Sequence, residues 1–236
     1  MLRLLVSAAA VTLATSVAIA EPTTRPGPGE VVRVAGDVPE PTPIEVDGDD
    51  GPETHWASGD ALVRTALPVG YPRPTPPGAV ELKAYAPVRQ AIVAGEGAEQ
   101  RAFFPLFRHI STRDIAMTAP VVMTGSTVGG DEVEGSMAFL YRSPDLGPVG
   151  DAEEGVVVED TEPGFFLSAG FQGSRRQGAL EEARVQLVET FEATLAQQGW
   201  RLVDGPVRLL GYNGPAMPRD RQWWEVQVPV EPIDAQ

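Results

Sequence analysis

Few side chains in this sequence are of the types that carry out chemistry. There are no cysteines, which removes disulfides, thiolate metal sites and a cysteine nucleophile. Three carboxylates, Glu81, Asp114 and Glu225, are candidates for chemistry, but each is isolated in the sequence, and no motif ties it to a base or a metal. The nucleophile-elbow, zinc-protease and phosphate-loop patterns are all missing from the sequence. These observations favour a binding protein over an enzyme.

The densest group of potential ligand contacts lies between residues 103 and 117. Phe103, Leu106, Phe107 and Ile110 recur at the spacing of one face of a short amphipathic helix. His109, the only histidine after residue 79, flanks this apolar stripe. A partly exposed helix residue with a backbone or water partner is the plainer interpretation of that histidine.

The composition excludes one class of partner. The chain has 236 residues, with 33 Asp and Glu against 18 Lys and Arg, for a net charge of −15. Nucleic-acid binding needs clustered positive charge, so we expect no nucleic-acid partner. Hydrophobic residues make up 42% of the chain, which is enough for a packed core.

The first 20 residues resemble an export signal. A positive Arg3 precedes the apolar run 4–14, and Ala18-Ile19-Ala20 is the small-x-small pattern of a cleavage site. We therefore expect a periplasmic or secreted protein without a stable membrane anchor after cleavage. An uncleaved N-terminal anchor is the alternative.

Residues 21–78 differ in composition from the rest of the chain. They hold 12 of the 23 prolines and an excess of acidic residues. Such composition favours an extended, solvated chain, so we expect a flexible segment. Its apolar islands, 31–34 and 61–67, are candidates for edge strands.

Residues 79–232 are predicted to form one α+β domain. The expected elements repeat as strand, helix, strand, strand in two halves. The first half comprises a strand over 80–93, a helix over 102–111 and strands over 115–123 and 136–141; the second comprises a strand over 165–171, a helix over 178–198 and strands over 207–211 and 223–230. Two such halves can close a curved antiparallel sheet, or distorted barrel, with both helices packed on it.

Several segments of this domain resemble the SOUL family of haem-binding proteins. They are residues 81–87 (Glu-Leu-Lys-Ala-Tyr-Ala-Pro), the helix with Phe103, Leu106 and Ile110, residues 115–121 (Ile-Ala-Met-Thr-Ala-Pro-Val), and residues 211–215 with Glu225-Val226. The resemblance covers about residues 79–231. It implies a distorted β-barrel of two β-α-β-β halves and non-covalent tetrapyrrole binding beside the first helix, for buffering, scavenging or transfer of haem.

One position departs from that family. Some members carry a histidine before the tyrosine of the opening strand, and here that residue is Ala84. His109 is then the candidate iron ligand, with Met117 and other methionines or tyrosines as less favoured alternatives, and haem held without any protein ligand as another. The apolar wall would comprise Phe103, Leu106, Phe107 and Ile110, and Arg113 would meet the haem carboxylates.

The same two-half architecture also resembles the gyrase-inhibitor-like effector-binding fold. In that fold an inward carboxylate on the last strand can bind cationic ligands, and some relatives hydrolyse small molecules. Glu225 lies at a corresponding place. The alternative hypothesis is therefore a periplasmic module that binds or hydrolyses a small molecule with Glu225, where a raised pKa would suit a general base. A structural role for Glu225 is the plainer interpretation.

Overall fold

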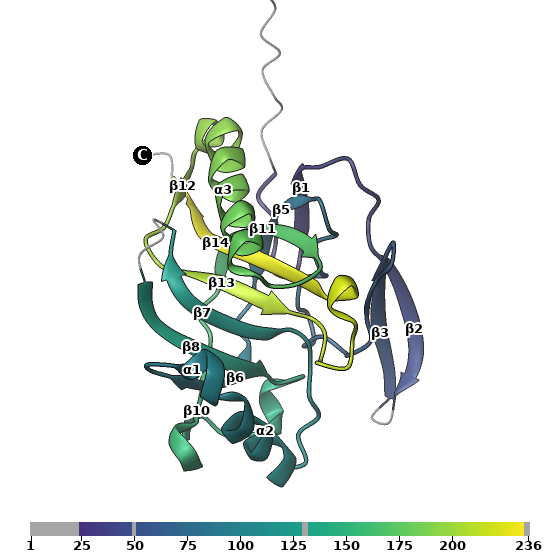
Figure 1. Ribbon diagram of the computed structural model, residues 1–236, viewed down its shortest axis with the longest axis vertical. Coiled ribbons are helices and arrows are strands. Elements are labelled where there is room, and N and C mark those ends of the chain that lie inside the picture. The colour runs from purple at the N-terminus through teal and green to yellow at the C-terminus, as the bar shows by residue number, and fades with distance from the viewer. Residues whose placement is uncertain (1–23, 49–50, 129–131, 234–236) are drawn as a thin grey trace, which may run out of the picture.

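The computed structural model describes residues 24–48, 51–128 and 132–233, and the expected signal peptide, 1–20, lies outside them. The described residues form a large antiparallel sheet, a small three-stranded sheet and three α-helices (Figure 1). The helices are α1 (Ala98–Arg101), α2 (Phe103–Thr112) and α3 (Gln177–Ala193). None of the described helices is long and apolar enough to cross a membrane.

The large sheet has eleven strands in the part of the chain that the structure describes. Its path runs β1-β5-β11-β14-β13-β7-β8-β6-β10-β9, and β12 pairs with β14. The strands are β1 (Val31–Ala35), β5 (Val80–Tyr85), β6 (Arg89–Ala94), β7 (Val121–Thr127), β8 (Glu132–Leu140), β9 (Gly150–Asp151), β10 (Val157–Asp160), β11 (Gly164–Gln172), β12 (Trp200–Leu202), β13 (Pro206–Gly211) and β14 (Trp223–Pro232). Within the described residues this path does not close into a barrel, so the structure is a curved open sheet.

The two predicted β-α-β-β halves are both present. The first comprises β5, β6, α1 with α2, β7 and β8, and the second comprises β11, α3, β13 and β14. The halves join where β13 pairs with β7 and where β11 pairs with β5. The predicted α+β class, with helices packed on an antiparallel sheet, is confirmed.

Prolines and glycines account for the shifted element boundaries. The strand expected over 80–93 is divided into β5 and β6 around Pro87, which lacks the N–H that a continuous ladder needs. The strand expected from Ile115 begins only at Val121, after Pro120. The helix expected to reach Gln198 leaves α geometry at Ala193, and a 3₁₀ turn (Leu195–Gln198) continues to Gly199, whose φ of 80° suits the left-handed cap.

Alternation along the strands divides the sheet into two faces. Met123, Met137 and Phe139 pack with the buried residues of α2 on one face. On the same face of the second half, Leu187 and Phe191 of α3 pack against the sheet. The opposite face, which carries Val122, Ala138 and Leu140, is not covered by any described helix; we call it the open face.

Part of the open face is covered by the N-terminal segment, and the expectation that residues 21–78 are flexible is wrong for its described part. β1 pairs with β5 at the edge of the large sheet. β2 (Thr42–Gly48), β3 (Gly51–Ser58) and β4 (Ala61–Val63) form the small sheet, whose Ala61 and Val63 are fully buried against the open face. Composition suggested solvation, but backbone pairing and these apolar residues order the segment.

Candidate functional site

A cluster of polar side chains lies buried on the open face. Lys83 on β5, Ser168 on β11 and Glu225 and Gln227 on β14 are all fully buried. They come from neighbouring strands of the sheet, where β11 pairs with both β5 and β14. Thr75, from the N-terminal segment, covers this cluster and is itself fully buried.

Glu225 is the hub of this cluster. Its two carboxylate oxygens accept hydrogen bonds from Lys83 Nζ (2.9 Å to each), Ser168 Oγ (2.5 Å), Tyr212 OH (2.6 Å), the Thr75 backbone N–H (2.7 Å) and Gln227 Nε2 (2.9 Å). Every lone pair of the carboxylate is therefore engaged within the protein. Glu225 has no exposed surface, so a ligand cannot reach it without displacing one of these partners.

The electrostatics agree with an ionised Glu225. Burial alone would raise its pKa, but the Lys83 charge and the donated hydrogen bonds outweigh burial, so the pKa lies below its ordinary value. Burial also lowers the pKa of Lys83, and the Glu225 charge opposes that effect. We conclude that the two form an internal ion pair, so the raised pKa that a general base would need is absent.

A second buried carboxylate adjoins the first. Glu81 is fully buried and accepts hydrogen bonds from Arg33 Nε (3.1 Å) and from the Arg73 guanidinium (3.0 and 3.1 Å). The Arg73 carbonyl oxygen also accepts from Lys83 Nζ at 2.7 Å. Both arginines belong to the N-terminal segment, so these contacts fix that segment to the sheet.

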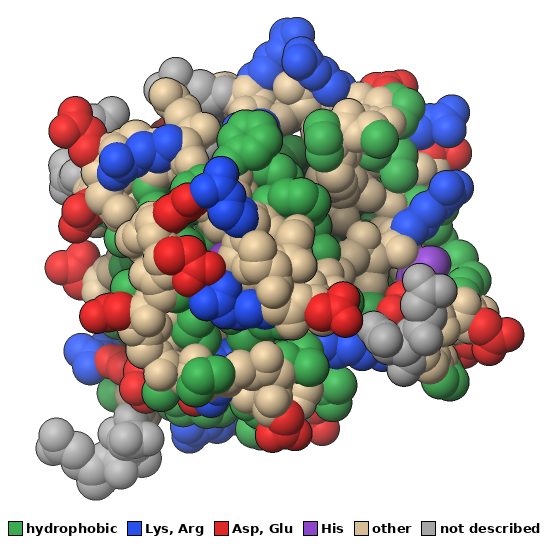
Figure 2. All heavy atoms as spheres, turned by 90° about the horizontal axis from the view of Figure 1, so that it is seen from below, with side chains coloured by type: hydrophobic (Ala, Val, Ile, Leu, Met, Phe, Trp, Pro, Cys, Tyr) green, Lys and Arg blue, Asp and Glu red, His purple; other side chains and the backbone are tan. Residues whose placement is uncertain are grey.

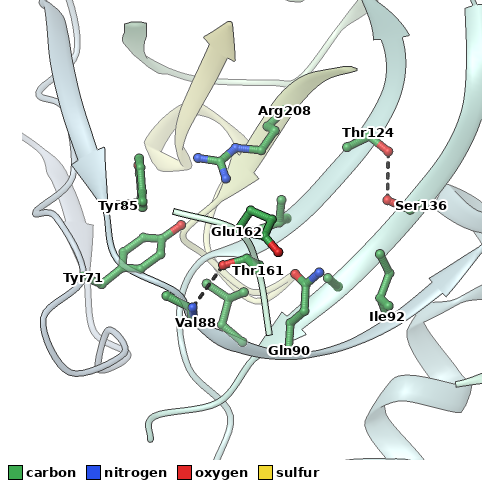
Figure 3. Close-up of a pocket in the computed structure, with 13 residues that line it drawn as sticks. Tyr71, Tyr85, Val88, Gln90, Ile92, Thr124, Ser136, Thr161, Glu162 and Arg208 are labelled. Carbon is green, nitrogen blue, oxygen red and sulfur yellow. Dashed lines mark hydrogen bonds between the residues drawn. The ribbon is translucent and has the colours of Figure 1, made fainter. Parts of the chain in front are cut away.

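Next to this network, the open face contains a pocket of about 130 Å³. Its apolar wall comes from β6, β7, β8 and the residue Val88, and comprises Val88, Ile92, Val122, Ala138 and Leu140. Its polar lining comprises Tyr71, Tyr85, Gln90, Thr124, Ser136, Thr161, Glu162 and Arg208 (Figure 3). An apolar wall with a few converging polar groups is the usual composition of a small-molecule site.

Arg208 links the pocket to the buried network. Its Nε and Nη2 both donate to Gln227 Oε1, and Gln227 Nε2 donates to Tyr85 OH and to Glu225. The guanidinium also stacks on the Phe166 ring, 3.4 Å from its centroid. Arg208 is thus held rigidly with one edge toward the pocket.

The residues predicted to hold haem do not gather around a pocket of porphyrin size. Leu106 and Ile110 are buried in the core between α2 and the sheet. Phe103 packs edge-on against Phe139, and Phe107 stacks on Phe103 while remaining 47% exposed. Most of the predicted apolar wall is therefore part of the protein core.

His109 is buried at the same end of the molecule. Its Nε2 lies 2.7 Å from the Tyr141 hydroxyl, and its Nδ1 has no partner among the described residues. Burial lowers the His109 pKa, with a smaller contribution from Arg113. The adjacent cavity, which His109 lines, is about 90 Å³, which is smaller than a porphyrin.

The remaining two predicted contacts lie on the surface. Arg113 forms an ion pair with Glu153, at 2.6 Å. Met117 is 37% exposed in the loop after α2. Figure 2 shows this end of the molecule, with hydrophobic side chains distributed among acidic and basic ones.

Sequence reasoning missed Tyr71, Lys83 and Arg208 as parts of the site. Lys83 stands at a polar position of an alternating strand, the pattern of a solvent-facing residue, yet it is fully buried. Tyr71 belongs to the segment expected to be flexible. The polar positions facing one another on β5, β11 and β14 were the available signal, but only the strand register brings them together.

Comparisons with known proteins address the fold. No protein-family profile matches the sequence, and no curated protein matches it. The crystal structure of the EcmrR C-terminal domain is similar, with a TM-score of 0.50 and 13% identity over 65% of this chain and 98% of that one. A hydrolase from Listeria innocua is also similar, with a TM-score of 0.51 and 13% identity over 67% of this chain and 94% of that one. The chain has the gyrase-inhibitor-like effector-binding fold, and at this identity the likeness establishes the fold alone.

Proposed function

We propose that this protein is a small-molecule-binding module whose ligand occupies the pocket on the open face. The observation that carries the proposal is the pocket itself, which combines a continuous apolar wall from β6, β7 and β8 with hydrogen-bonding groups at its other side. The site lies where the two halves of the fold adjoin, since Arg208 of β13 and Thr124 of β7 both line it.

Binding rather than hydrolysis is the activity that this geometry supports. A general base must reach its substrate, whereas Glu225 is enclosed, ionised and committed to Lys83. Its role is to hold the strands and the N-terminal segment in place. The hydrolytic form of the hypothesis therefore has no accessible base at Glu225.

Protein-observed methyl NMR with a fragment library tests the proposal. We expect hits that shift the methyl signals of Ile92 and Val122, and we expect these shifts to disappear in Thr124→Leu, which fills the pocket. Ser126→Leu is the matched control, because Ser126 lies on the same strand with similar exposure but does not line the pocket. Hits that bind both variants equally would contradict the proposed site.

Haem binding is a second candidate, favoured by one observation. Phe104 is 75% exposed and Phe107 is 47% exposed on adjacent turns of α2, which is unusual for large apolar side chains. A tetrapyrrole would have to lie on this outer surface of α2. Hemin titration of the wild type and of Phe104→Ser tests it: a Soret band that weakens in the variant supports the candidate, and a free-hemin spectrum in both excludes it.

Export remains the proposal for location. It rests on the sequence of residues 1–20, which the structure does not describe. N-terminal sequencing of the protein from a periplasmic or culture fraction tests it, and we expect Glu21 as the first residue. A cytoplasmic protein that begins at Met1 would refute it.

A further inference from the structure

The charges around the pocket on the open face are distributed unequally. Among the described residues, three carboxylates lie in or near it, and each is accounted for. Glu225 is sealed behind its hydrogen-bond partners, and Glu159 accepts a hydrogen bond from Gln90 Nε2 at 2.9 Å. Glu162 is exposed at the rim, where water screens its charge. Arg208 is the partly buried charged group of the pocket lining.

The Arg208 guanidinium presents an unused edge. Its Nε and Nη2 are engaged by Gln227, and its plane is covered by Phe166 and by Tyr85, whose ring centroid is 4.7 Å away. Within the described part of the chain Nη1 donates no hydrogen bond. Figure 3 shows the guanidinium directed toward the side of the pocket formed by Tyr71 and Tyr85.

Tyr71 supplies a second donor at the same side. Its ring lies edge-on to that of Tyr85, with the centroids 5.0 Å apart. The Tyr85 hydroxyl accepts from Gln227 Nε2. Burial raises the pKa of the Tyr71 hydroxyl, so it carries its proton at neutral pH and can donate that proton to a ligand.

The pocket size limits what can bind. Its volume of about 130 Å³ is close to that of an apolar cavity that admits benzene, about 150 Å³. The wall opposite Arg208 is aliphatic, so a single ring or a short alkyl chain fits there. A drug-sized ligand would need a pocket of at least roughly 300 Å³.

We propose that the pocket binds small organic anions, specifically monocarboxylates with one apolar ring or short chain, whose carboxylate contacts Arg208 Nη1 and the Tyr71 hydroxyl. This inference rests on the proposed function and names its ligand class. A rigid arginine edge with a neighbouring hydroxyl is suited to a carboxylate. A cationic ligand would instead have to approach Arg208 after losing its hydration shell, and the one carboxylate among the described residues that line the pocket is the screened Glu162.

Three probes of the same shape test the charge preference. Benzoate, benzamide and benzamidine differ in charge and little in size. We expect wild-type protein to bind benzoate at least about tenfold more tightly than benzamide, the effect of one charge-assisted contact. Benzamidine should bind more weakly than benzamide. Calorimetry gives the affinities, and the Ile92 and Val122 methyl shifts locate the binding.

Two variants assign the preference to residues. Arg208→Gln should remove the preference, so that benzoate binds this variant no more tightly than benzamide does. Arg208→Lys keeps the positive charge and replaces Arg208→Gln in the test if that variant does not fold. It should retain part of the preference for benzoate over benzamide. Glu162→Gln, the control that removes the rim charge, should leave the order of the three probes the same and tighten benzoate slightly.

The outcomes separate this inference from the proposed function. Tighter binding of benzamidine, or equal binding of all three probes in the pocket, overturns the anion preference and leaves the binding function standing. Methyl shifts at Ile92 and Val122 with none of the probes overturn both. Benzoate preference that survives Arg208→Gln also contradicts the inference, because the assigned contact is then not its source.

Discussion

Replacing Glu225 by glutamine is the sharpest perturbation of the buried network. The substitution keeps the shape and one acceptor oxygen but removes the charge that faces Lys83, whose side chain is fully buried. Removing one partner of a buried ion pair costs about 3–5 kcal/mol, because the other charge stays desolvated. For a protein of this size each kcal/mol lowers Tm by about 2–4 °C, so Glu225→Gln should lower Tm by about 6–20 °C.

A double-mutant cycle isolates the pair. Lys83→Met alone should also cost about 3–5 kcal/mol, since the Glu225 charge is left unpaired. The double variant should be more stable than the sum of the two single effects predicts, by about 1–3 kcal/mol. Urea unfolding followed by tryptophan fluorescence gives the free energies of unfolding. Arg201→Gln is the control, because Arg201 and Glu231 form an ion pair that is mostly exposed and worth at most about 1 kcal/mol.

The pH dependence has a defined sign. Because the folded-state pKa of Glu225 is lowered, its contribution is complete above the unfolded pKa of about 4.3 and is lost as pH falls through the lower folded value. The stability difference between wild type and Glu225→Gln should therefore shrink in acid. A difference below about 1 kcal/mol at neutral pH, or no coupling in the cycle, would refute the assignment of Glu225 and Lys83 as an ionised pair.

Three further predictions concern other contacts. The Glu153 carboxyl, whose pKa is lowered to about 2 chiefly by its hydrogen bond with Arg113, should titrate near that value by ¹³C NMR and move toward about 4.3 in Arg113→Gln; an unchanged midpoint would contradict the pairing. Trypsin should not cleave the native chain after Arg33, which lies in β1 and whose side chain is held by Glu81, and early cleavage there would show that the segment is not docked. Gly170→Ala should cost about 1–3 kcal/mol in urea unfolding, because a Cβ would lie 2.5 Å from the Pro76 carbonyl oxygen; a neutral effect would mean that this close approach does not form.

Periodicity predicted the architecture better than it predicted the site. The alternation over 80–85 and the 3.6-residue stripe at Leu106 and Ile110 identified β5 and α2, because one face of each element is buried against the core. The same logic misjudged Lys83. An alternating pattern assigns every second residue to solvent, and it carries no information about a second layer that covers that face.

The covering layer is the reason that the N-terminal segment was misjudged as well. Proline content and acidic charge describe how a chain behaves alone, whereas Thr75 and Arg73 are ordered by partners distant in sequence, Glu225 and Glu81. The haem site predicted at His109 stays a prediction. One helix face was expected to contact a ligand; its residues Leu106 and Ile110 are buried in the core, and a pocket lies on the open face, on the other side of the sheet.

Methyl NMR of the wild-type protein with a carboxylate fragment set tests the central claim most directly. We predict saturable shifts of the Ile92, Val122 and Leu140 methyl signals, which line the pocket on the open face, together with loss of those shifts in Thr124→Leu. Shifts confined to α2 and its neighbours, or none at the three pocket methyls with any fragment, would contradict the claim that this pocket is the binding site.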